Sequence, residues 1–220
     1  MFTGLIETTG TITAVTGSST SIELTVQPQR LPFETTIGAS VAIDGACLTV
    51  VKQTDKGALV FTAVKETLQR TTLSTPQRGC KVNMERALRI NGRLDGHMVL
   101  GHVDGVGVIE SDRKEGIALL RTVKVPGQLS RFLAEKGSVS IDGISLTIAH
   151  TNDNLITISL IPHTLKETTM IEKKQGEPVN IECDVLARYI CHMVSAEKKS
   201  PNVPPSTNNS LLKQMERYGF

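Results

Sequence analysis

The ten residues VAIDGACLTV, at positions 41–50, occur a second time as VSIDGISLTI at positions 139–148. Val41, Ile43, Asp44, Gly45, Leu48 and Thr49 are unchanged in the second copy, so six of the ten positions are identical. The thiol of Cys47 is replaced by the hydroxyl of Ser145. A long stretch that returns in one chain is typical of an internal duplication. The sequence therefore predicts two copies of one fold that differ chemically at this position.

Three further blocks repeat in the same order. TGLIETTGTI (3–12) matches LGHVDGVGVI (100–109), TLQRTTL (67–73) matches TLKETTM (164–170), and GCKVNME (79–85) matches GEPVNIE (176–182). Their offsets are 97, against 98 for the first block, so the register is nearly constant. We expect one copy over 1–88, a linker over 89–97 and a second copy over 98–185.

Each copy has the pattern of β-structure. Apolar Ile22, Leu24 and Val26 alternate with polar residues, and a similar alternation covers LITISLI at 155–161. Period two over short runs is typical of half-buried antiparallel strands. Asp-Gly pairs at 44–45 and 142–143 favour tight turns between such strands. We expect a barrel or sandwich in each copy, and one helix at 128–136.

After the second copy, the apolar residues change from the spacing of a strand to that of a helix. Leu186, Ile190, Met193 and Val194 recur at helical spacing, which predicts a helix over 186–199 with an apolar face. So short a helix needs a partner, either its own barrels or other copies of the chain. Residues 200–220 begin with a segment rich in Pro, Ser and Asn, and we expect a flexible tail.

The composition excludes several classes of protein. The 220 residues carry 24 basic and 22 acidic side chains, a balance that gives no case for a nucleic-acid partner. No apolar run approaches the ~20 residues of a membrane helix. The N-terminus lacks the pattern of a signal peptide. Four scattered cysteines, at 47, 80, 183 and 191, do not make a disulfide scaffold, so we expect a protein of the cytoplasm.

The candidate reactive side chains are Cys47, Ser145 and two histidines. Both copies place a short nucleophilic side chain before Leu-Thr, so Thr49 and Thr147 are predicted on the same strand face as Cys47 and Ser145. Cys47 is either a nucleophile or a small packing residue. His102 follows a glycine at the start of a strand, which favours a general acid or base. His97 is interpreted as a linker residue, and a metal site at the two histidines is not expected.

The motifs MFTG, GASVAIDGACLTV, VKETL, GHVDG, KGSVSIDGISLTI, IPHTL and VNIECD resemble the riboflavin synthase family in kind and order, over residues 1 to about 190. The resemblance implies an all-β fold of two six-stranded antiparallel Greek-key barrels and a C-terminal helix that joins three chains. It implies a transferase in which two molecules of 6,7-dimethyl-8-ribityllumazine exchange a four-carbon unit and give riboflavin and 5-amino-6-ribitylamino-uracil. It implies no cofactor and no metal, active sites between neighbouring subunits, and an association with lumazine synthase.

The resemblance also implies the site residues. The N-terminal pocket takes Gly4, Leu5 and Ile6, Cys47, Leu48 and Thr49, and Thr62, Ala63, Val64, Lys65, Glu66 and Thr67. The C-terminal pocket takes Gly101, His102 and Val103, Lys136, Ser145, Leu146 and Thr147, and Ile161, Pro162, His163, Thr164, Leu165 and Lys166. Phe2, Ser40 and Asp184 match further positions tied to activity, beside the catalytic candidates Cys47, His102 and Ser145.

Two pockets suit a reaction between two identical molecules, and a difference between the pockets suits the unequal roles of donor and acceptor. His102 is a candidate base for the acidic 7-methyl group of the lumazine. Two other classes stay open. Lumazine-binding antenna proteins share the fold and need only one good pocket, and a duplicated barrel with purely structural hydroxyls needs none.

Overall fold

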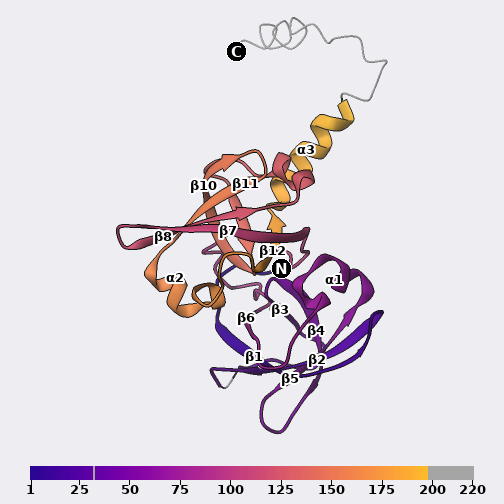
Figure 1. Ribbon diagram of the computed structural model, residues 1–220. Coiled ribbons are helices and arrows are strands. Elements are labelled where there is room, and N and C mark those ends of the chain that lie inside the picture. The colour runs from indigo at the N-terminus through magenta and orange to yellow at the C-terminus, as the bar shows by residue number, and fades with distance from the viewer. Residues whose placement is uncertain (32, 198–220) are drawn as a thin grey trace, which may run out of the picture. The chain divides into compact units, whose positions relative to one another are not determined.

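The computed structural model describes residues 1–31 and 33–197. Strands dominate, and they form two closed six-stranded barrels (Figure 1). The first barrel contains β1 (Thr8–Ser18), β2 (Ser21–Pro28), β3 (Ser40–Ile43), β4 (Ala46–Gln53), β5 (Leu59–Val64) and β6 (Lys81–Arg86). The second contains β7 (Gly105–Glu115), β8 (Ala118–Lys124), β9 (Ser138–Ile141), β10 (Ile144–Asn152), β11 (Leu155–Leu160) and β12 (Pro178–Cys183).

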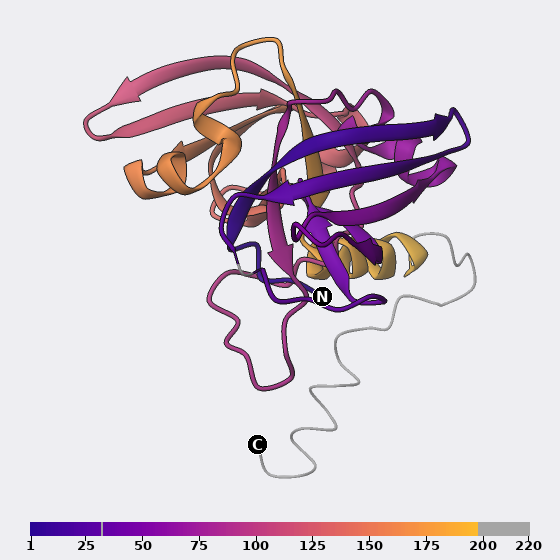
Figure 2. The same ribbon diagram turned by 90° about the horizontal axis from the view of Figure 1, so that it is seen from below.

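The two barrels have the same topology. Around the first, the strands follow the order β1-β2-β5-β4-β3-β6, and the second repeats it as β7-β8-β11-β10-β9-β12. All strand pairs are antiparallel. This is the predicted Greek-key order, and closure leaves no free edge in either of the two sheets formed by the described residues. The β7–β8 hairpin extends beyond its barrel (Figure 2).

Each barrel is filled by the residues that the alternation predicts. Ile22, Leu24 and Val26 of β2 are buried in the first core, and Ile156 and Ile158 of β11 are buried in the second. Their polar neighbours in the sequence point outward, because successive side chains of a strand face opposite sides. The cores are mainly aliphatic, as expected for a chain with 3% aromatic residues, although Phe33 and Phe61 are buried in the first.

Short helices lie between the strands. They are α1 (Lys65–Arg70), α2 (Pro162–Glu167) and 3-10 turns at Thr72–Ser74, Gly127–Phe132 and Thr169–Ile171. Neither α1 nor α2 was among the helices that the sequence predicted. The helix predicted over 128–136 is only a 3-10 turn, which buries Leu129, and the chain then passes Lys136 in the left-handed region at φ 64°. The helical turn has already ended by then, because the backbone of Leu133 is extended.

The C-terminal helix α3 spans Val185–Glu197. Asp184 precedes it, and its Oδ1 accepts a hydrogen bond from the Leu186 backbone N–H at 2.9 Å, a typical N-terminal cap. Leu186, Ile190 and Met193 are each more than half exposed. The predicted tail at 200–220 lies outside the described residues. No helix among those described is long and apolar enough to cross a membrane.

The two Asp-Gly turns meet between the barrels. A Cβ atom on Gly45 would lie 2.7 Å from the backbone N of Gly143, so the turns touch through bare backbone. Asn83 Nδ2 donates to the Asp142 carbonyl at 2.9 Å, and Asn180 Nδ2 donates to the Asp44 carbonyl at 2.8 Å. These two hydrogen bonds are equivalent, as they would be if a two-fold axis related the two copies.

One charge breaks this symmetry. Lys173 Nζ lies 2.8 Å from the Asp142 carboxylate, whereas the residue equivalent to Lys173 in the first copy is the uncharged Pro76. Burial, followed by the charge of Asp142, raises the pKa of Asp44 to about 8. The junction therefore holds two buried carboxyl groups and one ammonium group.

Candidate functional site

Residues 2–6 precede the first barrel and residues 99–103 precede the second. Each of these two leading segments packs on the opposite barrel, so the segments are exchanged. Phe2 and Val99 pair through two backbone hydrogen bonds of 2.6 and 3.2 Å. Beyond this bridge, the Gly4 carbonyl accepts from Ser145 N of the second barrel at 2.8 Å. The Gly101 carbonyl accepts from Cys47 N of the first barrel at 2.9 Å. Each leading segment therefore lies on a strand of the opposite barrel.

Side-chain packing follows the same exchange. Ile6 packs against the core of the second barrel, together with Leu165. Val103 belongs to the core of the first barrel. The prediction that Gly4, Leu5 and Ile6 join Cys47, and that Gly101, His102 and Val103 join Ser145, is therefore wrong. Sequence similarity groups residues by copy, but the packing of the segments groups them across the copies.

A cleft of about 410 Å³ lies where the 99–103 segment crosses the first barrel. Of the predicted residues, Cys47, Glu66, Thr67, Gly101, His102 and Val103 line it. Ala46, Arg70, Thr71, Asp104 and Arg188 also line it, although sequence reasoning did not select them. The volume lies within the range of small-molecule sites, ~300–1,000 Å³. The cleft thus combines a half-buried thiol with an exposed imidazole.

The charged groups of this cleft are paired. Arg70 forms an ion pair with Glu66 one helical turn earlier on α1. Arg188 Nη2 lies 2.7 Å from Asp104 Oδ1. Both guanidinium groups line the cleft, where they can donate to carbonyl or hydroxyl oxygens of a ligand.

Phe2 and Gly101 shape the floor behind Cys47. Phe2 is fully buried in a small cluster with Ala42 and Val99, against which Cys47 packs. Gly101 has φ +79°, and a Cβ atom there would lie 2.5 Å from Cys47 Cβ and 2.9 Å from the Phe2 ring. Only glycine fits this crossing. The structure therefore places Phe2 directly against the segment that carries His102.

The equivalent position on the second barrel carries a different set of side chains. Ser145 Oγ lies 2.7 Å from Nδ1 of His97, and His97 is 9% exposed. Burial lowers the pKa of His97, and the charge of Asp184 opposes this shift. His97 lies in the connection between β6 and β7, but its buried contact with Ser145 makes it more than a linker residue. Leu5 occupies the place that His102 holds on the first barrel, so the two sites differ at both key positions.

The other predicted residues of the second site differ in their exposure. Ile161, Pro162, His163 and Lys166 are exposed on or beside α2, whereas Thr164 is half-buried. Lys136 is exposed and holds a left-handed backbone at φ 64°. A non-glycine residue in that region is uncommon and often marks a functional position. Thr147 and Thr49 are exposed on the same strand faces as Ser145 and Cys47.

Several predicted residues lie elsewhere. Leu48 and Leu146 are buried and point into the barrel cores, so only their backbone faces the outside. Thr62, Ala63, Val64 and Lys65 do not line the cleft, and Ala63 is buried in the first core.

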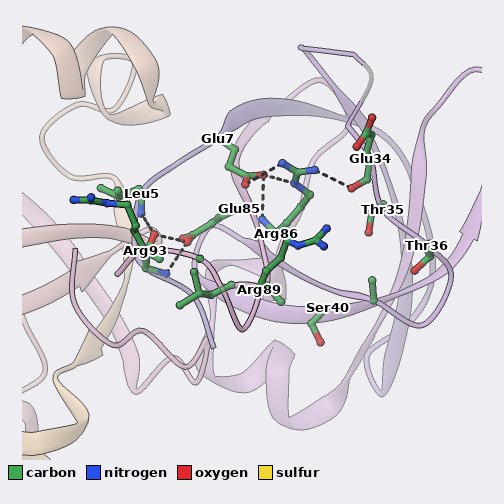
Figure 3. Close-up of a pocket in the computed structure, with 15 residues that line it drawn as sticks. Leu5, Glu7, Glu34, Thr35, Thr36, Ser40, Glu85, Arg86, Arg89 and Arg93 are labelled. Atoms are coloured by element: carbon green, nitrogen blue, oxygen red, sulfur yellow. Dashed lines mark hydrogen bonds and ion pairs between the residues drawn. The ribbon is translucent and has the colours of Figure 1, made fainter. Parts of the chain in front are cut away.

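Ser40 lines a larger hollow of about 1,040 Å³, which contains neither Cys47 nor His102 (Figure 3). Arg86 bridges the side chain of Glu7 and the carbonyl of Glu34 there. The smaller cleft is the candidate reactive site because it brings Cys47 and His102 together. Within residues 1–31 and 33–197, no three His, Cys, Asp or Glu side chains come together in a way that could hold a metal.

Known proteins share both the sequence and the fold. The profile of the lumazine binding domain matches residues 3–87 and again residues 100–184. Riboflavin synthase of Photobacterium phosphoreum is 40% identical, over 100% of this chain and 99% of its own. Riboflavin synthase of Bacillus subtilis (strain 168) is 41% identical, over 86% of this chain and 88% of its own. The crystal structure of LumP complexed with riboflavin superposes with a TM-score of 0.77 at 22% identity, over 83% of this chain and 99% of its own. The chain therefore belongs to the riboflavin synthase family and carries two lumazine-binding domains.

Proposed function

We propose that the protein catalyses the dismutation of two molecules of 6,7-dimethyl-8-ribityllumazine. One molecule donates a four-carbon unit to the other, which becomes riboflavin, and the donor leaves as 5-amino-6-ribitylamino-uracil. The two substrates together contain every atom of the two products, so the reaction needs no oxidant, reductant or cofactor. The observation that carries the proposal is the pair of equivalent but chemically unequal sites, Cys47 with His102 and Ser145 with His97.

His102 is the candidate base. It follows Gly101 at the edge of the cleft, where its exposed imidazole can reach a bound ligand. The 7-methyl group of the lumazine is acidic because its anion delocalises into the electron-poor ring system, so a weak base can remove its proton. Removal of that proton creates the carbon nucleophile that attacks the second lumazine.

Cys47 and Ser145 are assigned roles at the lumazine rings, either at the ring that is attacked or at the ring that gives up its four carbons. A thiol or hydroxyl at these positions adds to the ring or orients a water molecule that adds. Holding two rings at reacting distance is a large part of the rate enhancement, up to ~7–11 kcal/mol in ideal cases. The outward-facing threonines, Thr49 and Thr147 among them, offer hydroxyl partners to the ribityl chain.

The proposed assembly is a homotrimer in the cytoplasm. The exposed apolar residues of α3, among them Leu186, Ile190 and Met193, give three chains a surface to bury together. A reacting pair of lumazines then lies between the first barrel of one subunit and the second barrel of its neighbour. The four cysteines form no disulfide, which suits a reducing compartment. Association with lumazine synthase, which would supply the substrate, stays a prediction.

The structural neighbours favour one alternative, a lumazine-binding antenna without turnover. LumP, to judge by its crystal structures, binds riboflavin and 6,7-dimethyl-8-(1'-D-ribityl) lumazine with this fold. Incubation of the purified protein with the lumazine alone, with and without EDTA, separates the two functions. We expect riboflavin to form at the same rate in both. Tight binding without riboflavin would assign the protein to the antenna class.

A further inference from the structure

Two equivalent carboxylates, Glu85 of β6 and Glu182 of β12, are almost completely buried on the outer faces of the barrels. Their exposed fractions are 3% and 4%. Glu85 lies opposite Ala42 in the strand register, and Glu182 lies opposite Ser140. On their other side, Ala42 pairs with Cys47 and Ser140 pairs with Ser145. A single strand therefore separates each glutamate from the reactive position of its barrel.

Among the described residues, neither carboxylate has a cationic hydrogen-bonding partner, and both accept from the backbone of a leading segment. Glu85 accepts from Thr3 N at 2.6 Å, from Thr3 Oγ1 at 2.7 Å and from Gly4 N at 3.0 Å. Glu182 accepts from Leu100 N at 2.7 Å and from Gly101 N at 3.0 Å. Both oxygens of each side chain are used. Burial raises the pKa of both groups, and these N–H donors oppose the shift.

These bonds and the exchange of the segments act together. Glu182 belongs to the second barrel, yet the segment it holds lies on Cys47 of the first barrel and presents His102 to the cleft. Glu85 belongs to the first barrel, and the segment it holds lies on Ser145 of the second. Each segment is therefore fixed on one side by a carboxylate of its own barrel and on the other by a strand of the opposite barrel.

We propose that Glu85 and Glu182 are positioning residues, each fixing the segment that completes the lumazine site on the opposite barrel. This inference rests on the proposed function. Glu182 governs the site of Cys47 and His102, and Glu85 governs the site of Ser145. A glutamine cannot replace either one, because an amide has a single acceptor oxygen and turns an N–H donor toward the second backbone N–H.

The variants Glu182→Gln and Glu85→Gln test the proposal, with Glu110→Gln on the exposed face of β7 as the control for charge. Hydrogen exchange of the backbone is measured first, without any ligand. We expect faster exchange over 99–103 only in Glu182→Gln and over 2–6 only in Glu85→Gln. Loss of one charge-assisted hydrogen bond should then weaken lumazine binding about 10- to 100-fold at one site of the two. Glu182→Asp, which keeps a carboxylate, should recover part of the affinity.

Three results would overturn the proposal. They are unchanged exchange in both segments, equal loosening of both segments by either variant, and normal lumazine binding despite a loosened segment. If Glu182→Gln does not fold, Glu182→Asp is measured in its place with the same criteria. The exchange experiment does not depend on turnover. A wild-type protein that binds lumazine but makes no riboflavin would therefore contradict the proposed function and leave the positioning role open to the same test.

Discussion

The substitution Gly101→Ala tests whether the crossing of the 99–103 segment over the first barrel builds the reactive cleft. The new Cβ would lie 2.5 Å from Cys47 Cβ and 2.9 Å from both Cys47 N and the Phe2 ring. Two of these neighbours belong to a strand backbone and to a fully buried ring, so neither yields easily. The segment must lift instead, which breaks the hydrogen bond from Cys47 N to the Gly101 carbonyl.

The expected magnitude has two parts. A left-handed backbone is unfavourable for alanine by about 1–2 kcal/mol, and overpacking adds about 1–3 kcal/mol. Together they oppose the crossed geometry by about 2–5 kcal/mol. Since 1.4 kcal/mol corresponds to a factor of ten, lumazine should bind the first site about 30-fold more weakly or worse.

Gly176→Ala is the matched control. Gly176 has φ +87°, close to that of Gly101, but a Cβ there meets nothing within 4 Å. We expect this variant to lose only the backbone part, about 1–2 kcal/mol, which lowers Tm by about 2–8 °C and leaves lumazine binding unchanged. Fluorescence titration with the lumazine, together with thermal unfolding, compares the two. Equal lumazine affinity in the two variants would refute the crossing as a part of the site.

Three other predictions concern single groups and the assembly. Cys47→Ser should keep much of its activity if Cys47 packs and hydrogen-bonds, as Ser145 in the other copy suggests, while His102→Gln should lower kcat by about 10²–10⁴-fold. If the Cys47→Ser variant were inactive and the His102→Gln variant active, with normal lumazine binding by both across pH 6 to 9, these roles would be reversed. Because folding holds a proton on Asp44 up to pH about 8, the free energy of unfolding should fall with rising pH between about 4 and 8, by at most ~1.4 kcal/mol per pH unit from this group. Asp44→Asn should flatten that slope in urea unfolding measured at several pH values, and an unchanged slope would contradict the buried-carboxyl account. Deletion of 186–220 should leave folded barrels but abolish trimers and activity together, and a fully active monomer would contradict the intersubunit site.

The duplicated sequence made the fold predictable because its signals are local. Alternation in β2 and β11 and the Asp-Gly turns at 44–45 and 142–143 act over a few residues, and the repeat doubles each of them. The six-residue helices α1 and α2 are too short for a helical period to appear in the sequence. The expected helix at 128–136 is a 3-10 helix over Gly127–Phe132, because the backbone is already extended at Leu133.

The site was only partly predictable because it depends on contacts between the copies. Cys47 and Ser145 were apparent as the one reactive difference in a repeated stretch. The exchange of the leading segments was not, since it follows from the close approach of Gly4 and Gly101 to the opposite barrel. His97 has no equivalent in the first copy, so comparing the copies did not single it out. Glu85 and Glu182 left a signal that was available, an identical residue at the end of both GCKVNME and GEPVNIE.

The most direct test of the central claim uses the lumazine labelled with ¹³C in the four carbons that the reaction transfers. The purified protein is incubated with this compound alone, and both products are analysed by mass spectrometry. Dismutation predicts riboflavin with two labelled sets of four carbons and unlabelled 5-amino-6-ribitylamino-uracil, in equal amounts. Riboflavin with a single labelled set, a labelled pyrimidine, or bound lumazine that stays unchanged would contradict the account.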